Sequence, residues 1–109
     1  METNKNKIKV LYMEVGKEAK VIEIEKDLKS YQKLVDGWIE SVSLSEDVVL
    51  ILNEEGKLRY LPPNKGLYNK DGNILDVLVG NLFICRVDED GDFADFKDED
   101  MELVNKHLR

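Results

Sequence analysis

Apolar and polar residues alternate along the N-terminal part of the chain, and this pattern predicts two β-strands. Residues 7–15 (KIKVLYMEV) alternate, and residues 19–25 (AKVIEIE) resume the alternation after a break at Gly16. A period of two with many β-branched residues is typical of strands that bury at least one face. The short connection between them indicates a hairpin or a close antiparallel pair.

A short helix is expected next, over residues 28–36. Asp27 stands before it and can accept a hydrogen bond from an N–H group of the first turn, and Gly37 is placed to end it. Four apolar residues fall on one stripe of this helix: Leu28, Tyr31, Leu34 and Val35.

The middle of the chain predicts three further strands. Residues 38–44 alternate, and residues 47–53 (DVVLILN) form the continuous apolar run that is typical of a central strand. The turn signal NEEG at 53–56 predicts that residues 57–61 (KLRYL) fold back as a hairpin partner. Pro62-Pro63 should end that strand, because neither residue can donate a hydrogen bond to a ladder.

The C-terminal part predicts two strands and a final helix. Residues 74–79 and 82–87 have strand-like composition, although the first of them also fits one helical turn. A helix beginning at Asp98 would place apolar residues on one stripe, namely Met101, Val104 and Leu108. The chain is therefore expected to form a single α+β domain over residues 1–109, with residues 1–6 flexible. Its architecture would be a mainly antiparallel sheet with a short helix after the second strand and a C-terminal helix.

Negative charge is concentrated in residues 88–102 (DEDGDFADFKDEDME). Nine of these fifteen residues are acidic and only Lys97 is basic, so the stretch carries a charge of −8, against −7 for the whole chain. Negative charge for solubility alone needs no clustering, so we expect a surface that attracts a basic partner and repels nucleic acid and anionic membranes. The residues predicted to bind the partner are Asp88, Asp90, Asp92, Asp98, Glu99 and Asp100, with Phe93 or Phe96 as an apolar anchor.

The sequence contains no strong catalytic motif, so we expect neither an enzyme nor a metal or other cofactor. The Asp spacing that starts at Asp88 partly fits a calcium loop, but Phe93 stands at position six, where Gly is required. Cys85 is the only cysteine and lies in the apolar run LFIC, which indicates a buried, inert thiol. His107 is the only histidine and lies at the end of the final helix, where a role in stabilising the helix dipole is expected.

A second hypothesis assigns binding to the loop LPPNKGLY at residues 61–68. Asn64, Lys65 and Tyr68 offer polar contacts there, on a frame that two prolines stiffen. Such a loop would suit a small ligand, for instance a nucleotide signal. The same residues equally fit an ordinary turn at the end of a sheet, and the sequence leaves both interpretations open.

The chain is expected to act in the cytosol. Its longest unbroken apolar runs, residues 48–52 and 82–85, are too short to span a membrane. Its N-terminus (METNKNKIKV) passes straight from polar residues into a strand-like pattern, without the hydrophobic stretch of a signal peptide.

Several blocks in this order resemble a family catalogued only as a domain of unknown function. The blocks are YMEVGKEAKVIEI, LVDGWIESVSL, DVVLILNEEGKL, LPPNKGLY and ILDVLVGNLFIC, followed by the acidic turn and a terminal helix. The resemblance covers nearly the whole chain and brings no catalytic residues. It implies a setting in phages, plasmids and conjugative elements of Gram-positive bacteria, where some proteins resemble anti-CRISPR proteins that act on the type II RNA-guided nuclease.

The resemblance and the charge distribution together predict a small counter-defence inhibitor of the anti-CRISPR kind. Its partner would be a basic nucleic-acid-processing protein in the host cytosol, with the type II CRISPR nuclease as the named candidate, and it would block the loading of guide RNA or DNA. Two alternatives stay open: a small-ligand binding protein and a non-catalytic accessory protein of a mobile element. The oligomeric state also stays open.

Overall fold

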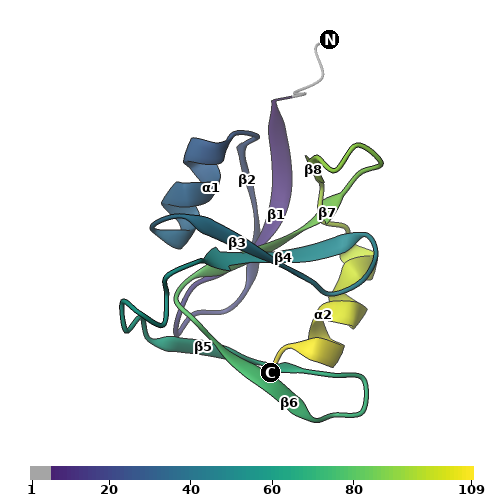
Figure 1. The fold of residues 1–109 in the computed structure, drawn as a ribbon. Helices are drawn as coiled ribbons and strands as arrows, with labels where there is room; N and C mark the ends of the chain where they lie inside the picture. The colour runs from purple at the N-terminus through teal and green to yellow at the C-terminus, as the bar shows by residue number, and fades with distance from the viewer. Residues whose placement is uncertain (1–5) are drawn as a thin grey trace.

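An antiparallel sheet with the strand order β2-β1-β7-β4-β3 forms the centre of the molecule, and β8 pairs with β7 (Figure 1). The computed structural model describes residues 6–109. The strands of this sheet are β1 (Lys7–Met13), β2 (Lys20–Glu25), β3 (Ile39–Ser43), β4 (Val48–Asn53), β7 (Leu82–Val87) and β8 (Phe93–Ala94). Every residue of β4 is buried, which agrees with the central position predicted from its unbroken apolar run.

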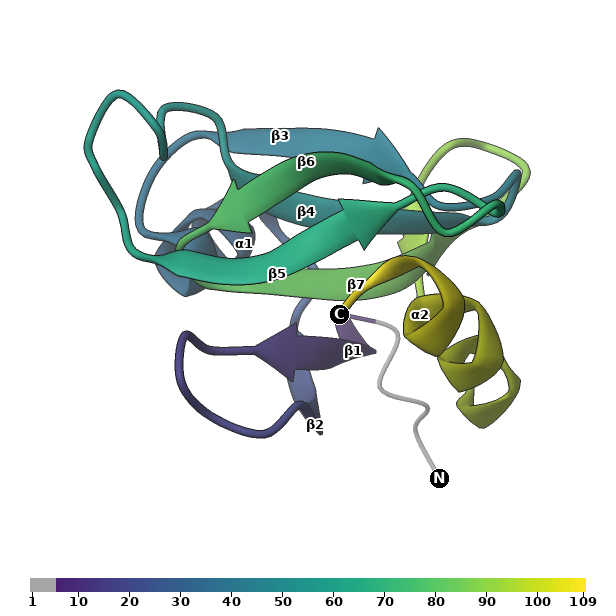
Figure 2. The same ribbon diagram turned by 90° about the horizontal axis from the view of Figure 1, so that it is seen from below.

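A separate hairpin of β5 (Pro63–Tyr68) and β6 (Ile74–Val79) packs on one face of this sheet (Figure 2). The Asn69 side chain closes its turn by accepting hydrogen bonds from the N–H groups of Asp71 and Asn73, at 3.0 and 2.9 Å. On the other side of β5, the C-terminal Arg109 exchanges two backbone hydrogen bonds with Gly66, of 2.8 and 3.0 Å. The hairpin therefore has one capped edge, along β5.

Two helices lie on opposite faces of the central sheet (Figure 1). Helix α1 (Leu28–Val35) begins at Asp27, whose carboxylate accepts a hydrogen bond of 2.8 Å from the N–H of Ser30. It packs against the odd-numbered residues of β4, whereas helix α2 (Met101–His107) and the β5–β6 hairpin pack against the even-numbered residues. The short 3₁₀-helix η1 (Asp98–Asp100) leads into α2.

The predicted fold class is confirmed: the structure is a mostly antiparallel α+β domain with a short helix after the second strand and a C-terminal helix. Residues 1–5, which fall in the segment predicted to be flexible, lie outside the described residues. No helix within residues 6–109 is long and apolar enough to cross a membrane.

The strand predicted for residues 57–61 is wrong. Residues 54–60 form turns instead, in which the N–H of Leu61 bonds to the carbonyl of Gly56 (3.0 Å) and the N–H of Tyr60 bonds to that of Lys57 (3.2 Å). This is the hydrogen-bond pattern of a Schellman motif, and Tyr60 holds its left-handed position with φ 54°. The motif reverses the chain, so the KLRYL segment has no strand to pair with.

The two prolines also act differently from the prediction. Pro63 begins β5 and does not end a strand, and residues 64–68, expected to form a loop, continue that strand. A proline is tolerated at the first residue of a strand, because no ladder hydrogen bond from its nitrogen is needed there.

Candidate functional site

The loop between β7 and β8 holds its acidic side chains on an ordered frame. The Asp88 carboxylate accepts hydrogen bonds from the N–H groups of Asp90 and Asp92, at 2.9 and 3.0 Å. Gly91 takes the left-handed conformation that closes the turn, with φ 84°. The side chain of Asp88 is thus used inside the loop, whereas those of Asp90 and Asp92 are exposed.

A second acidic segment lies beside this loop. Because β4 pairs antiparallel with β7 and Val48 is opposite Arg86, the turn before β4 lies next to the segment after β7. The N–H of Val87 donates a 2.9 Å hydrogen bond to the carbonyl of Asp47. The neighbouring Glu46 and Asp47 side chains are exposed, and the sequence analysis did not include them.

The two segments surround a shallow hollow of about 830 Å³, which we call the acidic depression. Five carboxylate residues line it together with Arg86, Val87, Ala94 and Lys97; they are Glu46, Asp47, Asp88, Glu89 and Asp95. The arrangement brings carboxylates from the segment before β4 and from the segment after β7 to one end of the β4–β7 pair. Of the residues predicted for the partner surface, Asp88 lines the depression, and Asp90 and Asp92 follow it in the same loop.

Asp100 is not part of an exposed acidic surface, which corrects the prediction for this residue. Asp100 is only 4% exposed, and its carboxylate accepts two hydrogen bonds from Arg86, from Nε at 2.9 Å and from Nη2 at 2.7 Å. The backbone N–H of Lys97 donates a third, at 2.9 Å. Burial alone would raise the pKa of Asp100, but the hydrogen bonds from Arg86 and Lys97, and the positive charge of Arg86, lower it overall.

Asp98 and Glu99 lie in the same turn and keep exposed side chains. Glu99 also approaches Arg86, with 3.5 Å between its Oε2 and Nη2 of the guanidinium. The charge of Arg86 is therefore largely balanced by Asp100 and Glu99, and Lys97 is the other basic residue among those that line the depression.

The two phenylalanines predicted as anchors both pack against the hydrophobic core. Phe96 is 5% exposed and belongs to the core under α2, so the anchor role predicted for it is wrong. Phe93 is partly buried, with its ring centroid 4.8 Å from that of Tyr31 and 6.4 Å from that of Phe83. The acidic loop is therefore held to the fold by apolar contacts on both faces of the sheet.

The residues of the predicted ligand loop lie in β5, and two of them contact the protein itself. The Asn64 amide donates to the carbonyls of Met13 (3.0 Å) and Gly80 (2.8 Å), which ties the hairpin to the central sheet. The Tyr68 ring faces the guanidinium of Arg109 at 4.8 Å. Lys65 is partly buried and pairs with Leu78 in the hairpin. These contacts hold the segment within the hairpin and against the central sheet.

The reactive side chains also take structural positions. Cys85 is fully buried, and this burial raises the pKa of its thiol to about 12. His107 Nδ1 lies 2.7 Å from the carbonyl oxygen of Tyr68 and joins α2 to β5. Within residues 6–109, no three side chains of His, Cys, Asp or Glu are grouped so that they could hold a metal ion.

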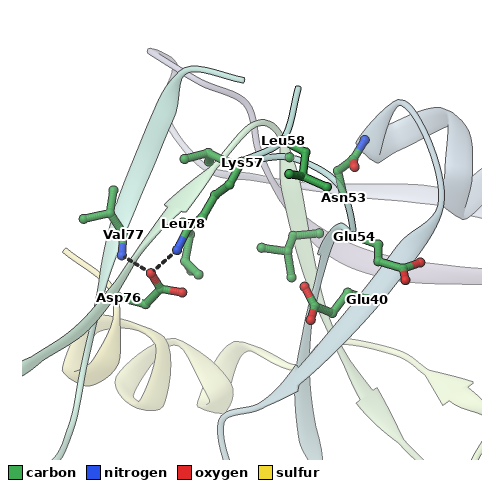
Figure 3. Close-up of a pocket in the computed structure, with 11 residues that line it drawn as sticks. Glu40, Asn53, Glu54, Lys57, Leu58, Asp76, Val77 and Leu78 are labelled. Atoms are coloured by element: carbon green, nitrogen blue, oxygen red, sulfur yellow. Dashed lines mark hydrogen bonds and ion pairs between the residues drawn. The ribbon is translucent and has the colours of Figure 1, made fainter. Parts of the chain in front are cut away.

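A second hollow, of about 260 Å³, lies between β6, the β3–β4 pair and the turn at 54–60. Lys57 reaches across it to the Asp76 carboxylate, which also accepts a 2.8 Å hydrogen bond from the N–H of Val77. Figure 3 shows this pair on one side of the hollow, with Glu40 and Glu54 on the other. Neither glutamate forms an ion pair with a residue of the described chain.

A comparison with protein families matches the chain to a domain of unknown function, DUF3846, over residues 8–109. The chain belongs to this family. The match runs from β1 to Arg109, so it covers the residues that line both hollows of this chain. No curated protein and no solved structure matches the chain.

Proposed function

We propose that this DUF3846 protein is a non-catalytic binding protein that uses its acidic depression to dock on a basic surface of another protein. The observation that supports this proposal is the convergence of Glu46 and Asp47 with the loop at 88–92, from segments about forty residues apart. Separate loops that bring like charges together oppose folding through repulsion. A cationic partner removes that repulsion when it binds.

The proposed partner is a nucleic-acid-processing protein in the cytosol. Such proteins carry grooves lined with Arg and Lys that normally hold phosphates, and carboxylates can pair with the same side chains. The resemblance to proteins of mobile elements makes the type II RNA-guided nuclease the first candidate, with its guide RNA or DNA channel as the surface that is blocked. In that role the protein acts as a counter-defence inhibitor.

The test is a competition between this protein and guide RNA for purified type II nuclease, followed by gel shift at low and high salt. The test variant reverses three exposed carboxylates whose side chains form no ion pair or hydrogen bond within residues 6–109, as Glu46→Lys, Glu89→Lys and Asp90→Lys. A charge-matched control reverses three exposed acids elsewhere, as Glu18→Lys, Glu23→Lys and Asp71→Lys.

The test variant should lose about tenfold or more in affinity, since each reversal removes an attraction of up to ~1 kcal/mol and adds a repulsion. The control variant, with the same net charge, should bind much more tightly than the test variant, and binding of the unmodified protein should weaken steeply as salt rises. Equal binding by the two variants would refute the proposed surface. Absence of binding by the unmodified protein would refute this partner.

A further inference from the structure

The β5–β6 hairpin and α2 cover one face of the central sheet but leave β3 partly uncovered. The β5–β6 hairpin and α2 pack on the face of the central sheet that carries the even-numbered residues of β4. Val42 of β3 and Leu44, which follows β3, lie on the same face. Viewed from below, β6 lies over β4, and β3 lies beyond the outer edge of β6 (Figure 2). Val42 and Leu44 are only partly buried, because no strand of residues 6–109 lies alongside that edge of β6 to cover them.

The edge of β6 that faces this space has outward-pointing backbone groups at Val77, which do not pair with β5. Gly66 directs both its N–H and its carbonyl to Arg109, away from β6. Gly66 is opposite Val77 in the antiparallel pair, so this is a non-hydrogen-bonded pair and the N–H and carbonyl of Val77 point outward. The Asp76 carboxylate accepts from that N–H and is held by Lys57 (Figure 3). The Asp76 carboxylate thus occupies the N–H of Val77, with which the backbone of a further strand would pair.

The side chains along this edge are unusually apolar for a free strand. Leu75 is 61% exposed and Val77 is 43% exposed on β6, and Leu58 of the neighbouring turn is 79% exposed. Free edges are commonly protected by charged residues, prolines or short length. Here Leu75 lines a hollow together with Val42 and Leu44, and Val77 and Leu58 add exposed apolar surface along the same edge.

The hollows at the two ends of this space carry opposite charge. At one end, Glu40 and Glu54 line the hollow in which Lys57 is already paired with Asp76. At the other end, the hollow between the end of β3, the β5–β6 turn and α2 is lined by Lys70 and Lys106, together with Val42, Leu44 and Leu75. Lys106 belongs to α2 on the β5 side of the hairpin, whereas Lys70 lies in the turn that leads into β6. We call the open edge of β6 between the two hollows, from Glu40 to Lys70, the β3–β6 groove.

We propose that the β3–β6 groove binds an extended segment of a partner protein, which adds to β6 as an antiparallel strand. β6 runs from the basic turn at Lys70 to the acidic hollow, so an antiparallel segment enters at Glu40 and leaves at Lys70. Its recognition pattern is therefore a Lys or Arg at the N-terminal end, branched apolar residues at alternate central positions and an Asp or Glu at the C-terminal end. This inference is independent of the acidic depression.

A second copy of the chain does not fit the groove. Antiparallel pairing of two β6 strands requires a two-fold axis perpendicular to the hairpin, which keeps both central sheets on the same side. Each β6 lies over its own β4, so the partner's β4 would occupy the place of β3. A free peptide segment brings no such layer with it.

The test uses a labelled peptide of six residues, the length of β6, with the sequence Lys-Val-Thr-Val-Thr-Glu, and measures its binding to the full chain by fluorescence anisotropy. The same peptide with its two charged residues exchanged serves as the comparison. We expect the first peptide to bind about tenfold more tightly than the second. Glu40→Lys should reverse this preference, whereas Glu23→Lys, an exposed glutamate on the opposite edge strand β2, should leave it unchanged.

Two backbone-directed variants complete the test. Val77→Pro removes the outward N–H without removing a hydrogen bond to β5, so it should abolish peptide binding. Asp76→Ala frees the same N–H and should tighten binding about threefold, an effect that loss of structure would not produce. Failure of the first peptide to bind would overturn the proposal. So would binding that neither Glu40→Lys nor Asp76→Ala alters, or sedimentation showing a dimer that Val77→Pro dissociates.

Discussion

Replacement of Asp100 by Asn should destabilise the protein substantially, although the sequence presents this residue as one acid among nine. The carboxylate is buried and accepts two hydrogen bonds from Arg86 and one from the backbone of Lys97, all within 2.7–2.9 Å. An Asn side chain keeps the shape but loses the charge, and it directs N–H groups at a donor. Arg86 is then left without its main partner.

The expected loss is about 2–3 kcal/mol in the free energy of unfolding. Breaking a buried ion pair on one side costs about 3–5 kcal/mol. The cost expected here is at or below the lower end of that range, because the Arg86 side chain is 24% exposed. Glu99 also remains 3.5 Å from Arg86 and can replace Asp100 as its ion-pair partner. Such a loss is a large fraction of the ~5–15 kcal/mol that stabilises a typical domain.

The assay is urea unfolding at pH 7, with Asp98→Asn as the matched control in the same turn. Asp98 is exposed and forms no ion pair with any residue from 6 to 109, so its replacement should change the free energy of unfolding by less than ~0.5 kcal/mol. Equal stability of Asp100→Asn and Asp98→Asn would refute the structural role of the Arg86–Asp100 pair.

The dependence on pH gives a second check. The pKa of Asp100 is lowered below its ordinary value of 3.8 in the folded protein. The charged carboxylate therefore contributes its full stability above the unfolded-state pKa, and that contribution is lost as the pH falls through the lower folded-state pKa. The stability difference between the unmodified protein and Asp100→Asn should be constant near neutrality and should shrink below about pH 3.8. A difference that grows in acid would contradict the assigned direction.

Two further predictions concern residues outside the acidic stretch. Tyr60→Gly should stabilise the protein by about 0.5–1 kcal/mol in urea unfolding, because Tyr60 is 92% exposed and occupies a left-handed position that Gly adopts without strain. Tyr60→Ala, which keeps a Cβ, should give no such gain, and equal effects of the two would refute the explanation. Cys85 should resist thiol reagents at neutral pH until the protein unfolds, because its pKa is raised to about 12 by burial; rapid labelling of the native protein would contradict this.

The sequence predicted most elements because their apolar patterns are unambiguous. The run in β4 and the alternation in β1 and β2 match strands in the structure, and the cap at Asp27 begins α1 as expected. The segment at 57–61 failed because its alternation imitates a strand. Its conformation depends on Gly56, whose Cα lies so close to Val79 that an added Cβ would be 2.8 Å from a methyl group. That contact forms only in the tertiary structure, so the local sequence could not indicate it.

The candidate site was predictable only in part, for a similar reason. The density of acids indicated the loop at 88–92, but the contribution of Glu46 and Asp47 depends on β4 pairing with β7, which is distant in the sequence. The β3–β6 groove exists because the β5–β6 hairpin does not extend over β3, and no local sequence pattern predicts that. Strand order, not composition, determines both surfaces.

The distinction between exposed and paired carboxylates also decides how the binding surface can be tested. A variant that reversed every acid of the stretch would include Asp88, which holds its loop through two backbone N–H groups, and Asp100, which neutralises Arg86. Loss of binding by such a variant would report unfolding as readily as loss of a contact. The three reversals at Glu46, Glu89 and Asp90 avoid both structural acids. A loss of affinity without a change in the free energy of unfolding then identifies the acidic depression and its adjoining loop as the surface that the partner contacts.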